Sequence, residues 1–164
     1  GNLLPSGEDG EIVVRGDLVM TGYLDRPEET AKTIVDGWLH TGDAGAIDER
    51  GYLFIKDRIR DIIISGGFNV YPTDVEAALV QHPAIRDCVV FSVPDDKWGE
   101  RVEAAIELAP EAAYDEAAVL AATKGLIGSV KTPKKLHVTD QLPKSAVGKV
   151  LRREARERFG DVAG

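Results

Sequence analysis

Short apolar runs separated by turn residues make up the opening part of the chain. Residues 11–14 form a β-branched run, and residues 27–34 have the proline start and the following Gly37 that are typical of a short helix. Residues 44–48 and 52–56 are strand-like runs joined by three turn residues, which predicts a tight antiparallel hairpin. This part of the chain is therefore expected to contain several short strands.

A second hairpin is expected around two adjacent glycines. The apolar runs at residues 62–64 and 68–70 flank Gly66 and Gly67, and glycine can adopt the positive φ angles that tight turns need. A helix should begin at Pro72, because apolar residues recur on one face after it until a His-Pro pair stops the pattern. The pattern here predicts a hairpin followed directly by an amphipathic helix.

The rest of the chain alternates strands with helices. The expected strands are residues 87–93, 101–108 and 136–138, and the expected helices are residues 115–127 and 150–159. Seven-residue spacing pairs Val119 with Leu126 and Leu120 with Ile127, and Gly128 should end that helix. Residues 57–61 carry four charges and are expected to form an exposed joint between two bodies. The part that begins at about residue 61 is therefore predicted to be a compact α+β domain without internal repeats.

The composition is that of a globular protein with one ordinary core. Of the 164 residues, 43% are hydrophobic and 29% are charged. No run approaches the roughly 18 apolar residues that a membrane span needs, and the start lacks a basic segment leading into an apolar stretch. A cytoplasmic protein without a membrane span is therefore expected. The single cysteine, Cys88, lies in an apolar run and should be a buried, inert thiol.

The charge of the chain is acidic overall but unevenly distributed. A net charge of -8 argues against nucleic acid as a partner, because phosphate binding requires an excess of Lys and Arg. From Lys131 onward, however, nine basic residues accompany four acidic ones. This cationic tail has two interpretations, a solvated helix face or a surface that meets a small polyanion.

Three segments carry recognisable motifs. Residues 38–43 read WLHTGD, residues 57–76 begin with DRIRD, and residues 142–149 read LPKSAVGK. In this order and at these separations they resemble the aromatic-x-x-Thr-Gly-Asp motif, the hinge-and-hairpin motif and the terminal lysine motif of adenylate-forming enzymes. The resemblance covers almost the whole chain, which is similar to the C-terminal portion of an AMP-forming acyl-CoA synthetase. The same superfamily contains fatty-acid-CoA ligases, peptide-synthetase adenylation domains and luciferases.

The resemblance implies an α+β fold with two parts. Residues 1–57 would be the C-terminal end of the large N-terminal AMP-binding domain, residues 58–60 the hinge, and residues 61–164 the small C-terminal domain. The small domain should combine β-hairpins with a short mixed sheet covered by helices. The part before the hinge would be a β-rich remnant of the large domain.

Two residues match the nucleotide-binding positions of the family. Asp43 matches the aspartate that accepts hydrogen bonds from the ribose hydroxyls, a role suited to an ionised carboxylate. Arg58 matches the arginine that reaches the ribose or a phosphate, where its planar fork can bind two oxygens. Local alternatives exist for both: Asp43 could cap the turn at Gly42, and Arg58 could pair with Asp57 or Asp61.

Four further residues match positions that act in different steps. Arg60 matches the hinge position, where the family usually has Asp or Lys, about which the small domain rotates between two poses. Gly66 and Gly67 match the hairpin that lines the channel for the CoA pantetheine arm, or are ordinary hairpin glycines. Lys149 matches the lysine that meets negative charge during adenylation, and the alternative is a solvated lysine on a flexible loop.

The resemblance also implies a reaction and its partners. The full-length protein should use ATP, with Mg²⁺ bound mainly through the ATP, to activate a carboxylic acid as an acyl-adenylate. It should then transfer the acyl group to CoA and release AMP and pyrophosphate. A fatty acid is the expected substrate and an aryl acid the second choice. No metal site made of protein ligands is expected, because the three histidines lie far apart and no other ligand is at a suitable spacing.

The family's phosphate loop and acyl pocket should belong to the large N-terminal domain, upstream of residue 1. We therefore expect this chain alone to be inactive. Two other functions stay open: an adenylation module that delivers its acyl group to a carrier protein, and a non-catalytic docking domain. The sequence of residues 65–72 resembles CoA-ligase hairpins, which disfavours a carrier-protein module. The presence of Lys149 and Asp43 disfavours a non-catalytic docking domain.

Overall fold

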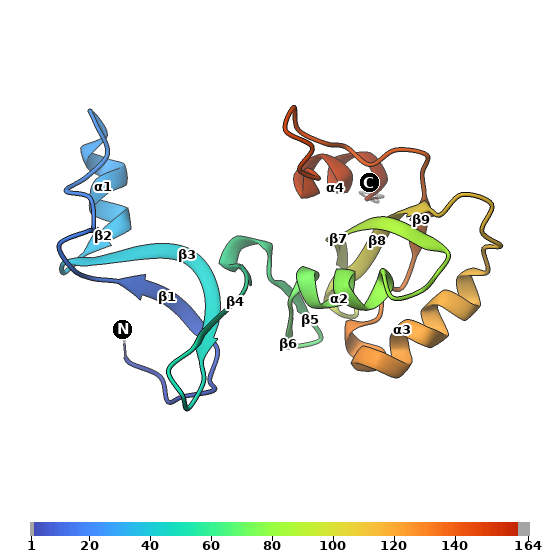
Figure 1. Ribbon diagram of the computed structural model, residues 1–164, viewed down its shortest axis with the longest axis horizontal. Coiled ribbons are helices and arrows are strands. Elements are labelled where there is room, and N and C mark those ends of the chain that lie inside the picture. Colours follow the sequence, from blue (N-terminus) through green and yellow to red (C-terminus); the bar gives the residue numbers. More distant parts are fainter. Residues whose placement is uncertain (1, 161–164) are drawn as a thin grey trace. The chain divides into compact units, whose positions relative to one another are not determined.

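The computed structural model describes residues 2–160 and is shown in Figure 1. The chain divides into two compact units, Gly1–Arg60 and Asp61–Gly164. Both contain helices and antiparallel strand pairs, so the α+β fold class expected from the sequence is confirmed. None of the helices formed by the described residues has the length and apolar character required to cross a membrane.

The first unit is built on a small antiparallel sheet. Its elements are β1 (Gly10–Val14), α1 (Pro27–Thr33), β2 (Ile34–Val35), β3 (Trp38–Ile47) and β4 (Leu53–Arg58). The long strand β3 pairs with all three other strands. The predicted short strands, the short helix and the hairpin are confirmed, but β3 begins well before residue 44 because its first half pairs with β1.

The predicted exposed joint at residues 57–61 is wrong in part. Asp57 and Arg58 form the end of β4, and Asp57 is only 8% exposed. Only Ile59–Asp61 leaves the sheet, as a single 3-10 turn. Four charges in five residues predicted a segment exposed to solvent, but strand pairing with β3 holds Asp57 in the sheet.

The second unit places helices on both faces of a five-stranded mixed sheet. Its elements are β5 (Ile63–Ser65), β6 (Phe68–Val70), α2 (Pro72–Leu79), β7 (Ile85–Asp95), β8 (Gly99–Leu108), α3 (Glu116–Lys131), β9 (Leu136–Val138) and α4 (Arg152–Phe159). The strand order is β6-β5-β8-β7, and β9 pairs with β8 as the one parallel neighbour among the described strands. The expected mixed sheet covered by helices is therefore confirmed.

Two apolar clusters fix the second unit, one on each face of the β7–β8 hairpin. The first cluster includes Val75 of α2 and Val119 of α3 packed against β7 and β8. The second includes Leu142 and Ala155 of α4 packed against the opposite face. Figure 1 shows α4 on one side of the sheet and α2 and α3 on the other. The segment that contains Leu142 is thus anchored to the core and is not a detached tail.

The helices follow the predicted pattern with one correction. Pro72, Val75 and Leu79 are among the buried residues of α2, as expected. Helix α3 buries Val119 but leaves Leu126 55% exposed, so the seven-residue pairing of these two is wrong. Leu120 and Ile127, the other predicted pair, both pack against the first apolar cluster. A φ of 77° at Gly128 interrupts α3, and helical structure resumes as far as Lys131.

Cys88 is buried, as predicted. Its residue is 7% exposed and belongs to the first apolar cluster. Burial, with the nearby negative charges of Glu76 and Asp87, raises the pKa of the Cys88 thiol to about 12. Because the thiolate is the reactive form, this thiol is inert at neutral pH.

Candidate functional site

Asp43 and Arg58 lie opposite each other across the β3–β4 pair. Their Cα atoms are register partners, and Arg58 Nε lies 2.9 Å from Asp43 Oδ1. Arg58 Nη1 also donates to the carbonyl of Thr41 at 3.3 Å. The side chain of Asp43 is 26% exposed and that of Arg58 is 55% exposed, so the pair is accessible to a ligand. The sequence had suggested Asp57 and Asp61 as partners for Arg58 and did not suggest Asp43.

The turn that presents Asp43 is capped by other residues. Gly42 has a φ of 71°, and its amide donates to Glu11 Oε1 at 3.2 Å. The amide of Asp43 donates to Thr41 Oγ1 at 3.1 Å, and that hydroxyl donates in turn to the carbonyl of Ile12 at 2.7 Å. The Asp43 carboxylate therefore does not cap the turn and is directed to Arg58 instead.

Sequence reasoning missed Glu11 as part of this region. One oxygen of Glu11 accepts the Gly42 amide, and the other lies 2.7 Å from Nδ1 of His40. Glu11 thus connects β1 to the Thr-Gly-Asp segment of β3. The available signal was an acidic residue at the start of a β-branched run, but its partners are about thirty positions away in the sequence.

The two hairpin glycines differ in what surrounds them. Gly66 and Gly67 have φ angles of 58° and 83°, which fit the two-residue turns that favour glycine. A Cβ on Gly66 would lie 2.8 Å from the Trp98 ring, and the Gly66 amide donates to the Trp98 carbonyl at 2.8 Å. A Cβ on Gly67 would meet nothing within 4 Å. Gly66 is therefore required by packing, whereas the backbone at Gly67 is open to an approaching molecule.

The lysine loop, which we define as residues 142–150, is closed by its own backbone. Lys144 and Val150 form an isolated bridge, and the amide of Ser145 donates to the carbonyl of Lys149 at 2.8 Å. The amide of Lys149 donates to Ser145 Oγ at 3.2 Å, and Gly148 supplies a φ of 80° at the turn. The loop expected from the sequence is closed into a short hydrogen-bonded hairpin.

Lys149 is exposed at the tip of this loop. Within residues 2–160, no acidic group or hydrogen-bond acceptor pairs with its ammonium. Lys144 and Arg152, by contrast, pair with carboxylates of the same unit. Part of the positive charge of the tail is thus neutralised internally, and Lys149 keeps a charge that can meet an anionic ligand.

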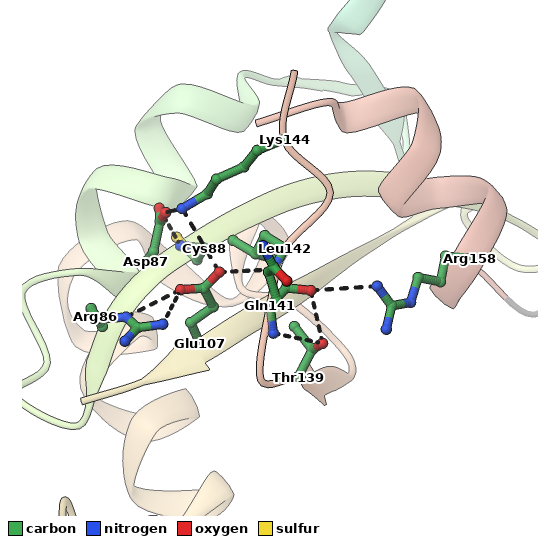
Figure 2. A network of polar contacts seen from close by, with 9 residues as sticks. All are labelled: Arg86, Asp87, Cys88, Glu107, Thr139, Gln141, Leu142, Lys144 and Arg158. Carbon is green, nitrogen blue, oxygen red and sulfur yellow. Dashed lines mark hydrogen bonds and ion pairs between the residues drawn. The ribbon is translucent and has the colours of Figure 1, made fainter. Parts of the chain in front are cut away.

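Sequence reasoning missed two carboxylates beneath the tail, the buried Glu107 and the half-buried Glu76. Glu107 of β8 is 3% exposed and binds Arg86 and the amide of Leu142, as Figure 2 shows. Glu76 of α2 accepts from Nη1 of Arg152 at 2.6 Å. An acid within a strand whose neighbours are apolar was the available signal for Glu107. Its partners could not be read locally, because Leu142 lies 35 positions away.

The remaining predicted site residues can be placed by unit. Arg60 lies in the 3-10 turn and is the last residue of the first unit, which also holds Asp43 and Arg58. Gly66, Gly67 and Lys149 belong to the second unit. Among the described residues, no three His, Cys, Asp or Glu side chains gather in a way that could hold a metal ion.

The donor set fits a nucleotide and a developing anion. The carboxylate of Asp43 can accept from hydroxyl groups, and Arg58 offers a guanidinium at the same edge. Lys149 offers an exposed ammonium on a closed loop. Hydrogen-bond acceptors suit the hydroxyls of a ribose, and cations suit a phosphate.

Comparison with known proteins agrees with this chemistry. The chain is 44% identical to the Medium/long-chain-fatty-acid--CoA ligase FadD8 of Mycobacterium tuberculosis, over 100% of this chain and 30% of that protein. It is also 44% identical to a feruloyl-CoA synthase of Amycolatopsis sp., over 98% of this chain and 33% of that protein. The structure of ATP-bound MatB from Rhodopseudomonas palustris matches with a TM-score of 0.90 and 40% identity, over 98% of this chain and 32% of that one.

The chain spans about a third of the length of these relatives. Residues 74–149 match the family described as "AMP-binding enzyme C-terminal domain". The matched segment contains most of the second unit, from α2 to the tip of the lysine loop. Over this segment the chain is similar to AMP-binding enzyme C-terminal domains, and its relatives are acyl-CoA ligases and other adenylate-forming enzymes.

Proposed function

We propose that this chain is the C-terminal part of an ATP-dependent, AMP-forming acyl-CoA synthetase. The full-length protein would join a carboxylic acid to the α-phosphate of ATP, release pyrophosphate, and then transfer the acyl group to CoA with release of AMP. The observation that carries the proposal is the exposed Lys149 ammonium, held without a partner among the described residues on a loop closed by backbone hydrogen bonds.

Lys149 would act in the adenylation step. A carboxylate oxygen attacks the α-phosphorus while the bond to pyrophosphate breaks, so negative charge builds on the phosphate and bridging oxygens. A fixed ammonium stabilises that charge most when its position is set before the reaction. The closed loop around Lys149 meets this requirement better than a free tail would.

Asp43 and Arg58 would bind the nucleotide. Their exposed ion pair is worth about 0–1 kcal/mol, as is usual for such pairs. Replacing part of it with contacts to ribose hydroxyls or a phosphate oxygen therefore costs little. Arg58 also holds the carboxylate of Asp43 in one orientation while the site is empty.

Two further assignments belong to the same proposal. Residues 1–57 would be the end of the large N-terminal domain, residues 58–60 the hinge centred on Arg60, and residues 61–164 the small domain. The division of the chain into two compact units after Arg60 supports this. The open backbone at Gly67 supports a role for the hairpin, with Gly66, in lining the path of the CoA pantetheine arm.

The acyl substrate is proposed to be a fatty acid. The relative named for medium- and long-chain fatty acids supports this choice. The feruloyl-CoA synthase has the same identity to this chain and supports an aryl acid equally well. The substrate would be chosen by the large N-terminal domain, so the choice between these classes must come from experiment. We also propose that the protein acts in the cytoplasm, with Mg²⁺ bound mainly through ATP.

The proposed function is tested by AMP release from the full-length protein over a panel of fatty and aryl acids, with and without CoA. We expect AMP release that depends on CoA and yields an acyl-CoA. The acid with the highest rate of AMP release identifies the substrate class. Pyrophosphate exchange that proceeds while CoA is ignored would instead indicate a carrier-protein acceptor. Absence of both activities with every acid would contradict the proposal.

A further inference from the structure

Glu107 lies buried beneath the base of the lysine loop. It is 3% exposed on β8, and both of its carboxylate oxygens are in use. Oε1 accepts the amide of Leu142 at 2.7 Å, and Oε2 accepts Nε of Arg86 at 3.1 Å and a second hydrogen bond from Nη2 of the same side chain. Figure 2 shows Glu107 between Arg86 on one side and Leu142 on the other.

A second contact holds the loop on the other side of Pro143. Nζ of Lys144 donates to Oδ2 of Asp87 at 2.7 Å and lies 3.8 Å from Oε1 of Glu107. Asp87 and Glu107 are register partners in the β7–β8 pair, so the two carboxylates are presented side by side by one rigid hairpin. The residues before and after Pro143 are therefore both fixed to the sheet by charged groups (Figure 2).

Glu107 and Lys144 are held in the ionised forms that these contacts need. Burial opposes ionisation of Glu107, but the Leu142 amide and the cations of Arg86 and Lys144 outweigh it and keep the pKa of Glu107 below its usual range. The hydrogen bond to Asp87 raises the pKa of Lys144. Glu107 and Lys144 are thus charged throughout the neutral pH range. We call Glu107, Asp87 and Lys144 together the loop anchor.

The loop anchor is connected to Lys149 through the backbone. Lys144 forms a bridge with Val150, and Pro143 accepts the amide of Leu151 at 2.8 Å. Both strands of the lysine loop are therefore connected to Leu142 and Lys144, the residues that Glu107 and Asp87 bind. Because Lys149 directly precedes Val150, any shift at the base of the loop displaces the ammonium at its tip.

A buried carboxylate contributes little net stability to a loop that it holds. Desolvation of a buried ion offsets most of the attraction to its partners, and an apolar residue of similar size is often as stabilising. Leu142 already gives this segment an apolar anchor that is 1% exposed. Glu107 adds a defined orientation, because its hydrogen bonds fix the Leu142 amide and the Arg86 guanidinium in place.

We propose that Glu107, together with the Asp87–Lys144 pair, is a positioning residue that sets the base of the lysine loop and thereby places the Lys149 ammonium for adenylation, an inference that rests on the proposed function. Glu107 does not touch the reacting atoms. Its contribution should therefore appear in the step that uses Lys149 and should be absent from the step that uses the hairpin at Gly67.

The test compares two buried acids of the same strand in the full-length protein. Glu107→Gln removes the charge under the loop. Glu103→Gln is the matched control, since Glu103 is 0% exposed, accepts from Nε of Arg101 at 2.8 Å and lies 2.7 Å from Nε2 of His137. Among residues 2–160, its polar partners are these two side chains and not the lysine loop. Each variant is assayed for pyrophosphate exchange and, separately, for thioester formation from a supplied acyl-adenylate.

Glu107→Gln should lower kcat for pyrophosphate exchange by about ten- to a hundredfold, the range typical of a misplaced catalytic group. The KM for ATP and the rate of thioester formation should stay within about twofold of the parent, which a general loss of folding would not allow. Glu103→Gln should leave the ratio of the two rates unchanged. Amide hydrogen exchange at Lys149 and Leu151 should be faster in Glu107→Gln and unchanged in the control.

Lys144→Met provides a second variant if Glu107→Gln does not fold, because the Lys144 side chain is 32% exposed and its removal leaves the core intact. It should give the same selective loss, smaller in size. Equal losses in both half-reactions, an unchanged exchange rate, or the same ratio change in Glu103→Gln would overturn the positioning role. A parent that forms acyl-adenylate while Glu107→Gln is unaffected contradicts this inference alone, whereas a parent that forms none contradicts the proposed function as well.

Discussion

At the scale of single residues, the partner of each charged group determines what it can do. Arg58 is occupied with Asp43, and Lys144 with Asp87, yet Lys149 has no partner among the residues from 2 to 160. Lysines on the same cationic tail thus have different roles. A charge count along the sequence cannot separate them, because the partners come from other strands.

Replacement of Lys149 by alanine should therefore act on one half-reaction. Loss of a fixed charge at a developing anion typically costs about 3–4 kcal/mol, or roughly two to three orders of magnitude in rate. We expect Lys149→Ala in the full-length protein to lower pyrophosphate exchange by that factor and to retain thioester formation from a supplied acyl-adenylate. Lys124→Ala, on the exposed part of α3, serves as the control. An equal fall in both half-reactions would contradict the two-pose assignment of Arg60.

The thiol of Cys88 should be unreactive in the folded protein. Its pKa is raised to about 12, mainly by burial, so almost none of it is thiolate at pH 8. We expect no reaction with a thiol-specific disulfide reagent under native conditions and complete reaction in denaturing urea. Rapid labelling of the native protein at pH 8 would show that the first apolar cluster opens readily.

At the scale of elements, turn geometry and long-range pairing each account for part of the outcome. The hairpin at Gly66 and Gly67 was predictable, because adjacent glycines between two apolar runs favour a turn with positive φ. The start of β3 at Trp38 was not, because its first half contains Gly42 and lacks a regular alternation. Pairing with β1 makes that segment a strand.

The two hairpin glycines should respond differently to alanine. Each has a positive φ, so each substitution carries a strain of about 1–2 kcal/mol. At Gly66 the added Cβ would also meet the Trp98 ring at 2.8 Å, and overpacking of this kind typically adds about 1–3 kcal/mol. Urea unfolding should therefore show a larger loss for Gly66→Ala than for Gly67→Ala. Equal losses would mean that the Trp98 ring moves aside without cost.

At the scale of the whole molecule, the chain is two compact units with different complements of functional residues. The first holds Asp43 and Arg58, and the second holds the hairpin glycines and Lys149. The relatives that match both units are about three times as long as this chain. The complete reaction is therefore proposed for a longer protein, with this chain supplying the lysine and the CoA-side hairpin.

The 164-residue chain alone should be inactive. We expect no AMP release from ATP, CoA and any acid of the panel, because the family resemblance assigns the phosphate loop and the acyl pocket to the large N-terminal domain. The full-length protein assayed beside it is the control. Appreciable acyl-CoA formation by the chain alone would contradict the assignment of residues 1–57 to a larger domain.

The sequence by itself determined the local elements and the motifs. Short helices with a proline start, hairpins at glycine turns and the spacing of WLHTGD and LPKSAVGK all depend on neighbours within a few positions. The local elements predicted the α+β class, and the resemblance of the motifs to those of adenylate-forming enzymes singled out Asp43 and Lys149. The sequence also predicted the burial of Cys88, because an apolar run around it is a local property.

Only the tertiary structure decided which charged groups meet. Asp43 faces Arg58 through the register of β3 and β4, and Glu107 reaches the base of the lysine loop across 35 positions. The seven-residue spacing predicted that Leu126 is buried, but its side chain is exposed. Burial of a helical residue depends on which elements pack against α3. Strand register and helix docking are set by the burial of whole faces, so no local pattern contains them.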